Sequence, residues 1–361
     1  TGNTNSVSNT YSWTQDDTGP TMTITSATVS SGATTATAAV ALTFTSNEAT
    51  SNFAQVDITE TGCSLGTFGT TSSTVYTDTC TVSADGAASV AVAASTFTDA
   101  LANANSVSNT YSWTQDDTGP TMTITSNTVS SGASTTTAAI VLIYTSNEAT
   151  SNFATGDITA TGCSDGSFTT TSTTVYGSTC TVSADGAASI SVAAGEFSDA
   201  TGNTNSVSNT YSWTQDDTGP TMTITSATVS SGSATNTAAV ALTFTSNEAT
   251  SDFAQADITE SGCSLGTFGT TSSTVYTDTC TASSEGTPSV SVAAGTFDDA
   301  TGNDNTVSNT YTWTYDSTAV TMTITSGTVS SGGTTATDPV VLIYTSNEAT
   351  TNFALADITE T

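Results

Sequence analysis

The chain has 361 residues with no Lys, Arg or His and 32 Asp plus Glu, which gives a formal charge of −32. This composition excludes catalytic sites built on His or Lys, such as a Ser-His-Asp triad, and side-chain ion pairs. It also excludes nucleic-acid binding, which normally needs Lys or Arg to displace phosphate counterions. We therefore expect a protein that is not an enzyme and has no nucleic-acid partner.

Apolar residues make up 35% of the chain and recur at regular intervals, which favours a folded protein over a disordered one. No apolar run approaches the roughly 20 residues of a membrane span, so no membrane insertion is expected in this segment. The first residues lack the charged start and apolar core of a signal peptide, and the chain starts in the middle of a repeat. We expect the segment to be a window on a longer array.

The segment NSVSNTYSWTQDDTGPTMTITS begins at Asn5 and recurs at Asn105 and Asn205, with a divergent copy at Asn305. The period is 100 residues without insertions. This period is too long for helical or leucine-rich solenoid units and suits an independent β-sandwich. Because the copies are nearly identical, the positions that differ between them carry more information than those that agree.

Within one repeat, apolar and polar residues alternate with period two, which predicts half-buried strands. About seven strands separated by Gly, Asn, Asp and Ser turns, without helical periodicity, predict an all-β fold of tandem immunoglobulin-like Greek-key sandwiches. In chain order the inward-facing residues are Val7, Tyr11 and Trp13 on the closing strand, then Met22 and Ile24, then Val40, Leu42 and Phe44, then Ile58, then Tyr76, Cys80 and Val82, and then Val90 and Val92. The expected core aromatics are Trp13, Phe44, Phe53, Tyr76 and Phe97.

The linker TQDDTGP, residues 14–20, connects the last strand of one domain to the first strand of the next. We therefore expect complete domains at 18–117, 118–217 and 218–317. Residues 1–17 would be the closing strand of a preceding domain, and residues 318–361 the opening strands of a further one.

Each full repeat contains two cysteines that are seventeen residues apart. A pair on neighbouring strands predicts an intradomain disulfide, which persists in oxidising compartments. The alternative, a zinc site, is incomplete because the chain has no His and no second Cys pair in each repeat. The predicted disulfides are Cys63 with Cys80, Cys163 with Cys180, and Cys263 with Cys280.

Carboxylates are the only strong chemistry in the chain, and Greek-key topology predicts that several of them converge at one end of each sandwich. The linker, the loop after the second strand and the loop before the closing strand should all lie at that end. Carboxylates gathered with backbone and Asn oxygens are the hard ligands that Ca²⁺ prefers. The candidate calcium ligands are Asp16, Asp17, Glu48, Asp57 and Asp99 in the first copy, Asp116, Asp117, Glu148, Asp157 and Asp199 in the second, and Asp216, Asp217, Glu248, Asp257 and Asp299 in the third.

Differences between copies separate these residues from other acids. Glu60 becomes Ala160 and Asp78 becomes Ser178, which suggests solvated surface charges. The alternative to calcium is an acidic surface adapted to salt water, in which Asp57 and Asp99 only cap turns. The sequence leaves both interpretations open.

The runs SNEATSNFAQVDITETGCSLGTF, TVYTDTCTVSADGAASVAVAASTFTDA and TGNTNSVSNTYSWTQDDTGPT resemble the bacterial immunoglobulin-like repeats of large surface adhesins and biofilm-associated proteins. The resemblance covers every repeat and implies extracellular domains that join into long rods and often hold calcium between neighbours. It implies Glu48, Asp57, Asp99 and Asp17 as ligands. The cysteine pair departs from the family pattern, and the last linker, YDSTAV, replaces Asp17 and Pro20 with Ser317 and Val320.

Residues 1–100 contain 26 Thr and 14 Ser, which suit outward-facing strand positions and are candidates for O-glycosylation. No Asn-x-Ser/Thr sequon occurs, and an ice-binding threonine array is disfavoured because sandwich strands twist. These features predict a structural region of a cell-surface filament or adhesin stalk that assembles with itself head to tail. The alternative is a module that binds surface glycans or a receptor.

Overall fold

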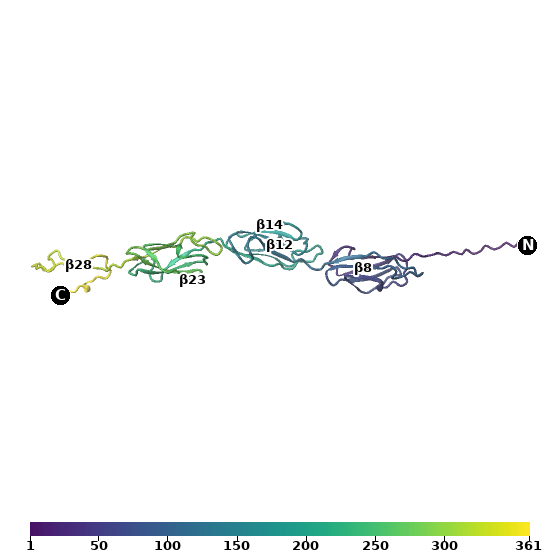
Figure 1. The fold of residues 1–361 in the computed structure, drawn as a ribbon, viewed down its shortest axis with the longest axis horizontal. Helices are drawn as coiled ribbons and strands as arrows, with labels where there is room; N and C mark the ends of the chain where they lie inside the picture. The colour runs from purple at the N-terminus through teal and green to yellow at the C-terminus, as the bar shows by residue number, and fades with distance from the viewer. The chain divides into compact units, whose positions relative to one another are not determined.

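The computed structural model describes residues 1–361 and divides into two compact units, Thr1–Asp216 and Asp217–Thr361. The first unit contains two β-sandwiches, and the second contains a third sandwich and residues 318–361 (Figure 1). Four three-residue 3₁₀ turns are the only helical elements. No helix in the structure has the length and apolarity needed to cross a membrane. The all-β prediction and the 100-residue period are confirmed.

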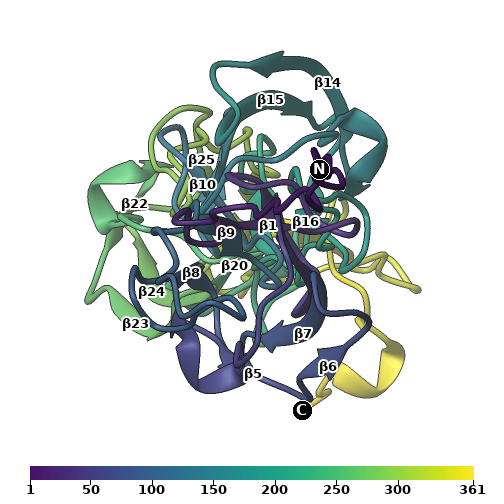
Figure 2. The same ribbon diagram turned by 90° about the vertical axis from the view of Figure 1, so that its right-hand side faces the viewer.

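The first and second sandwiches each pack two sheets with the same strand order. In the first sandwich one sheet has the order β1-β3-β7-β5, with β6 also paired to β7, and the other has the order β2-β9-β8-β4. All pairs are antiparallel except β2 with β9, and Figure 2 shows β5 and β6 beside β7. The elements are β1 (Met22–Thr25), β2 (Thr34–Thr35), β3 (Ala39–Ser46), η1 (Gln55–Asp57), β4 (Ile58–Thr61), β5 (Ser64–Leu65), β6 (Gly69–Thr70), β7 (Val75–Thr81), β8 (Gly86–Val92) and β9 (Tyr111–Gln115).

The later sandwiches repeat this plan with changes at the edge strand. In the third, the closing strand is also divided into β26 (Tyr311–Thr312) and β27 (Thr314–Tyr315), which belong to separate sheets. In the second sandwich β14 replaces the separate β5 and β6 with one strand that shifts register between Gly166 and Thr169. Its elements are β10 (Met122–Ser126), β11 (Ser134–Thr135), β12 (Ala139–Ser146), η2 (Thr155–Asp157), β13 (Ile158–Thr161), β14 (Ser164–Thr170), β15 (Val175–Thr181), β16 (Gly186–Val192) and β17 (Tyr211–Gln215).

The second unit contains the third sandwich and a short two-stranded sheet. The sandwich consists of β18 (Met222–Thr225), β19 (Ala234–Thr235), β20 (Ala239–Ser246), η3 (Gln255–Asp257), β21 (Ile258–Ser261), β22 (Cys263–Leu265), β23 (Gly269–Ser272), β24 (Val275–Ala282), β25 (Ser289–Val292), β26 (Tyr311–Thr312) and β27 (Thr314–Tyr315). Residues 318–361 contain β28 (Met322–Thr325), β29 (Ile343–Ser346) and η4 (Leu355–Asp357).

The predicted alternation of buried and exposed residues identifies the side chains that form the core. Along β3, Val40, Leu42 and Phe44 are buried while their neighbours face outward. Phe44 packs against Phe53 with ring centroids 5.9 Å apart, and Phe53 contacts Phe97 at 4.9 Å. Burial of such side chains contributes about 1.5–3 kcal/mol each. The core aromatics predicted from strand periodicity therefore lie where expected, apart from Trp13.

Two expectations for the closing strand are corrected. Trp13 is 75% exposed because residues 1–17 pair with no strand, whereas Trp113 at the same position of β9 is 2% exposed. Val7 was expected to face the core, but its counterpart Val107 lies before β9 and is 67% exposed. Just before β9, a side chain joins the chain to β1. The Asn109 side chain accepts the Ile24 N–H at 2.8 Å and donates to the Ile24 carbonyl at 3.0 Å.

A glycine permits the crossover from β4 to β5. Gly62 has φ +71°, and a Cβ there would lie 2.2 Å from the carbonyl oxygen of Ala87. Only glycine combines that left-handed conformation with so close an approach. The crossover brings Cys63 beside β7, where Leu65 pairs with Cys80.

Candidate metal centre

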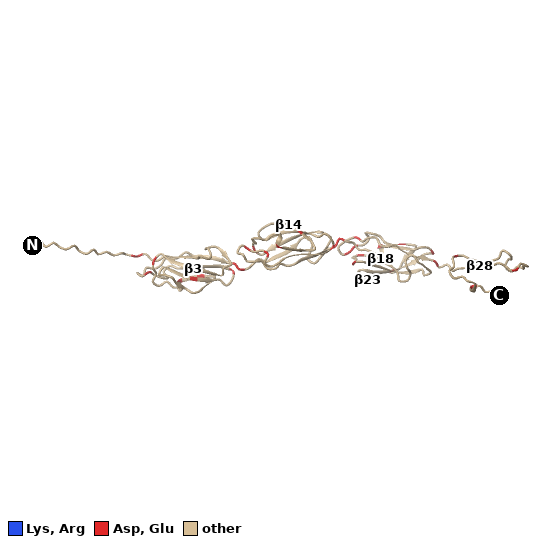
Figure 3. Cartoon of the chain, turned by 180° about the vertical axis from the view of Figure 1, so that it is seen from behind, with Lys and Arg blue, Asp and Glu red and all other residues tan.

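Three carboxylates from three separate segments meet at one end of the first sandwich. Asp16 belongs to the linker, Glu48 follows β3, and Asp99 follows β8. One oxygen of each lies within 4.8 Å of the others, and Asp116, Glu148 and Asp199 form the same group in the second sandwich. Figure 3 shows Asp and Glu gathered at sandwich ends, with no basic residue beside them.

The loop after β8 holds Asp99 in place. Asp99 pairs with Thr50 through an isolated antiparallel bridge and is 5% exposed. Its Oδ1 accepts the N–H groups of Leu101 at 2.9 Å and Asn103 at 2.8 Å, and the Asn103 amide donates to its Oδ2 at 2.9 Å. Burial opposes the charged form, but these hydrogen bonds outweigh it and lower the pKa of Asp99. Asp99 is therefore fixed as an anion.

The same asparagine fixes the linker. The Asn103 Nδ2 also donates to the carbonyl oxygen of Asp16 at 3.2 Å, and Asn203 does the same to Asp116 at 2.9 Å. The Asp-x-x-x-Asn spacing of this loop thus joins two members of each carboxylate group. The side chain of Asn105 closes the loop by accepting the Phe97 N–H at 3.0 Å.

The pKa of Glu48 is affected by the negative charges of the other two carboxylates in this group. Burial raises its pKa, and the negative charges of Asp16 and Asp99 raise it further. In the second sandwich burial raises the pKa of Glu148, with added contributions from Asp116, Asp199 and Asp85. The Oε1 atoms of Glu48 and Glu148 are buried and accept no hydrogen bond. Three gathered carboxylates with an unsatisfied oxygen fit a hard cation such as Ca²⁺.

The remaining predicted ligands lie elsewhere. Asp57 was expected in the group, but its Oδ2 accepts the Ala54 N–H at 2.8 Å and closes the 3₁₀ turn. The same bond holds Asp157 and Asp257 at their own turns. This placement agrees with the turn-capping alternative for Asp57, whereas Asp99 joins the carboxylate group.

The two consecutive aspartates of each linker lie in different places. Asp116 is in the carboxylate group, and its N–H donates to the Thr35 carbonyl at 3.0 Å. Asp117 is outside that group, as is Asp17. Asp216 ends the first unit and donates its N–H to Thr135 at 3.0 Å. Asp217 begins the second unit, where Glu248 and Asp299 occupy the loops corresponding to those of Glu48 and Asp99.

Sequence reasoning missed Asp85 in the loop that joins β7 in one sheet to β8 in the other. Its Oδ1 accepts the N–H of Asp117 at 2.8 Å, so this loop of the first sandwich lies beside the linker that supplies Asp116 to the second carboxylate group. Its charge contributes to the raised pKa values of Asp116 and Glu148. The available signal was that an acid stands at this position in every copy, as Asp85, Asp185 and Glu285.

Asp78 was read as a surface charge, and that reading is wrong. Asp78 is 3% exposed and accepts hydrogen bonds from the Gln55 amide at 2.8 Å and the Gly66 N–H at 3.0 Å. In the second sandwich a different network fills this place, with Ser178 donating to Asp165 at 2.6 Å and lying 2.9 Å from the Tyr144 hydroxyl. Burial there raises the pKa of Tyr144 to about 12. The substitution Asp78 to Ser178 is thus one part of a concerted exchange.

All three predicted disulfides are present, with sequence separations of 17 and no free cysteine. In the first sandwich Cys80 is fully buried on β7, and Cys63 stands beside it at the edge of the same sheet. Each bond therefore pins the edge of a sheet that has few backbone hydrogen bonds of its own.

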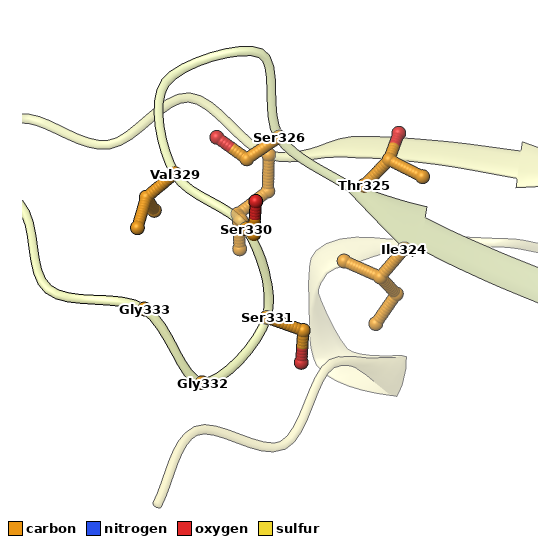
Figure 4. Close-up of a pocket in the computed structure, with 9 residues that line it drawn as sticks. Ile324, Thr325, Ser326, Val329, Ser330, Ser331, Gly332 and Gly333 are labelled. Atoms are coloured by element: carbon orange, nitrogen blue, oxygen red, sulfur yellow. The ribbon is translucent and has the colours of Figure 1, made fainter.

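A cavity of about 620 Å³ in residues 318–361 resembles a ligand pocket (Figure 4). Ile324, Val329 and Leu342 supply its apolar lining. Their counterparts in the first sandwich, Ile24, Val29 and Leu42, belong to the buried core that includes Tyr111 and Trp113 of β9. The cavity is a core face that no strand of residues 318–361 covers, and it indicates no ligand site.

Three stretches of the chain, residues 16–114, 116–214 and 216–315, match the model of a family described as bacterial Ig-like domain. Among solved structures, the Escherichia coli adhesin FdeC shares 14% identity, with 81% of this chain and 96% of that chain covered, at a TM-score of 0.34. Invasin, described as a bacterial integrin-binding protein, shares 16% identity, with 84% and 62% covered, at 0.35. InvD of Yersinia pseudotuberculosis shares 16%, with 79% and 71% covered, at 0.31. No curated protein sequence matches.

Proposed function

Since the chain belongs to the family of bacterial immunoglobulin-like domains, we propose that it is a structural, non-catalytic region of an extracellular filament or a surface adhesin stalk. In this proposal the sandwiches are spacers that are pinned by disulfides and stiffened by calcium, and the chain joins others head to tail. The proposed domains remain 18–117, 118–217 and 218–317, although the family matches begin near Asp16.

One observation carries the proposal. Two successive sandwiches place the same three carboxylates at the same end, and the linker supplies one of them. A cation bound there would tie the linker to the sandwich that follows it. Repeating one such end in successive, nearly identical domains suits a spacer, since a recognition surface gains little from copies of the same loop.

The structure offers little for catalysis. Asp99 and Asp199 are held as anions by backbone and Asn donors, so neither is suited to donate a proton near neutral pH. The cavity in residues 318–361 is an uncovered core face. These features support a role without chemistry, in keeping with a chain that lacks His and Lys.

Calcium is expected to stabilise the sandwiches strongly. At about a hundred times its Kd, a ligand that binds only the folded state adds about 2.7 kcal/mol, which corresponds to a Tm increase of roughly 10 °C or more. We expect this increase when millimolar calcium is added to chelator-treated chain in a calorimeter. Glu148→Gln should remove the increase for the second sandwich, because it removes one of three ligand charges.

Glu196→Gln is the matched control, because Glu196 is an exposed acid of the same sandwich outside the carboxylate group. A second control replaces calcium with NaCl of equal ionic strength, which screens repulsion without coordinating. An unchanged melting curve in millimolar calcium would remove calcium from the proposal and leave the disulfide-pinned spacer.

The competing function is a module that recognises a surface glycan or receptor. The outward face of the first sheet presents Thr25, Thr43 and Thr77 in one cross-strand row, which offers hydroxyls to a sugar or sites for O-glycans. However, the large apolar residues exposed in the complete sandwiches include no aromatic ring on which a sugar could stack. We expect no binding when the full chain is applied to a glycan array, and specific binding there would favour the competing function.

A further inference from the structure

The loop between β7 and β8, which joins the two sheets, reaches beyond its own sandwich to the linker that follows. Asp85 in this loop is exposed to solvent, yet both of its carboxylate oxygens accept hydrogen bonds. Oδ1 accepts the N–H of Asp117 at 2.8 Å, and Oδ2 accepts the hydroxyl of Thr118. One side chain thus holds two consecutive linker residues.

The third sandwich makes the same connection with different residues. Glu285 lies in the loop between β24 and β25, and its Oε1 accepts hydrogen bonds from the N–H of Ser317 at 3.1 Å, the Ser317 hydroxyl at 3.0 Å and the Thr318 hydroxyl at 2.5 Å. Relative to the first sandwich, Glu285 replaces Asp85 and Ser317 replaces Asp117, and the side chain still accepts the linker N–H. A contact that survives replacement of both partners is a constrained feature of the fold.

A second bond holds the same linkers just before this contact. Asp116 donates its N–H to the Thr35 carbonyl at 3.0 Å, and Asp316 donates to Thr235 at 3.1 Å. In the first unit the linker is therefore fixed to the preceding sandwich at three successive residues, 116 to 118. Asp116 is the residue that then supplies its carboxylate to the group with Glu148 and Asp199.

We propose that the acid in this inter-sheet loop is a positioning residue, a clasp by which the first and third sandwiches fix the path of the linker that follows. The clasp consists of Asp85 with Asp117 and Thr118 in the first unit, and of Glu285 with Ser317 and Thr318 in the second. It acts without a bound cation, and it presents Asp116 to the carboxylate group on which the proposed function rests.

The two clasps differ in electrostatics. Asp85 accepts the N–H of a second aspartate, Asp117, so like charges oppose the contact. Glu285 accepts from Ser317 and Thr318, neither of which is charged. Screening by salt should therefore tighten the first clasp and leave the second unchanged.

Amide hydrogen exchange of the full chain in chelator tests the clasp, because Asp117 and Ser317 each donate the amide that would be protected. Asp85→Ala should speed exchange at residue 117 by roughly tenfold, and Glu285→Ala should do so at residue 317. Because the repeats are nearly identical, the first linker is followed in peptides that extend to Asn127. Other copies have Ala27 and Ala227 at that position. Glu60→Ala, which removes an exposed acid remote in sequence from the linker, should change neither.

Raising NaCl to about 0.5 M should slow exchange at residue 117 relative to the Asp85→Ala chain and leave residue 317 unchanged. In the double variant Asp85→Glu with Asp117→Ser, amide exchange at residue 117 should become insensitive to salt, as it is at residue 317. Equal exchange at residue 117 in Asp85→Ala and the parent chain would overturn the clasp. The same salt response at both linkers would overturn the distinction between them. Because calcium is absent throughout, these outcomes do not depend on the cation proposal.

Discussion

Phe153→Ala is expected to destabilise the second sandwich by about 4 kcal/mol and to lower its Tm by roughly 20 °C. Phe153 is 7% exposed and is the centre of an aromatic cluster. Its ring lies 5.0 Å from Tyr176, 5.0 Å from Phe197, 5.6 Å from Phe168 and 5.7 Å from Tyr144. Alanine would remove the ring from all four contacts and leave a cavity that the disulfide-pinned sheet cannot close.

Calorimetry of the full chain checks this result with an internal reference. The first and third sandwiches keep their own phenylalanines, Phe53 and Phe253, so only roughly a third of the unfolding heat should move to lower temperature. Phe153→Leu should move it much less, and Val207→Ala, at an exposed position of the same sandwich, hardly at all. A single transition at the parental temperature would show that the cluster is not the centre of the core.

Reduction of the three disulfides is expected to destabilise every sandwich by about 3 kcal/mol and to lower Tm by roughly 15 °C. Each bond joins an edge strand to its neighbour across 17 residues, so its loss gives the unfolded chain more conformational freedom.

Calorimetry with and without a phosphine reductant, together with a count of free thiols, measures the effect. The variant Cys163→Ala with Cys180→Ala restricts it to the second sandwich and should split the transition as Phe153→Ala does. Six titrated thiols with an unchanged Tm would contradict the prediction, whereas six thiols before reductant is added would contradict the disulfides themselves.

The sandwich fold could be predicted from the sequence because buried and exposed residues alternate along nearly every strand. Met22 and Ile24 on β1, and Tyr76 and Cys80 on β7, face the core as period two requires. Val7 was misplaced because the chain before the closing strand has the same apolar spacing but follows β1 through Asn109, a contact that no periodicity reveals.

The carboxylate group was predictable in part. Topology alone brings the linker and two loops to one end, and this correctly selected Asp16, Glu48 and Asp99 as neighbours. It could not exclude Asp57, whose backbone hydrogen bond depends on the local 3₁₀ turn. It also missed Asp85, because the β7–β8 loop that carries it belongs to the opposite end of its own sandwich and meets the group of the next sandwich only across a linker.

The concerted exchange around Asp78 has a consequence for how such an array changes length. Recombination between nearly identical gene segments adds or deletes whole 100-residue units and leaves every sandwich intact. A crossover within a unit is different, because Gln55, Asp78 and the partner set of Tyr144, Asp165 and Ser178 are alternative solutions to one buried polar position. A hybrid that combines Asp165 with Asp78 would bury two facing carboxylates, and a hybrid that lacks both would leave donors without an acceptor. Residues 44 to 78 are therefore expected to be exchanged as a block.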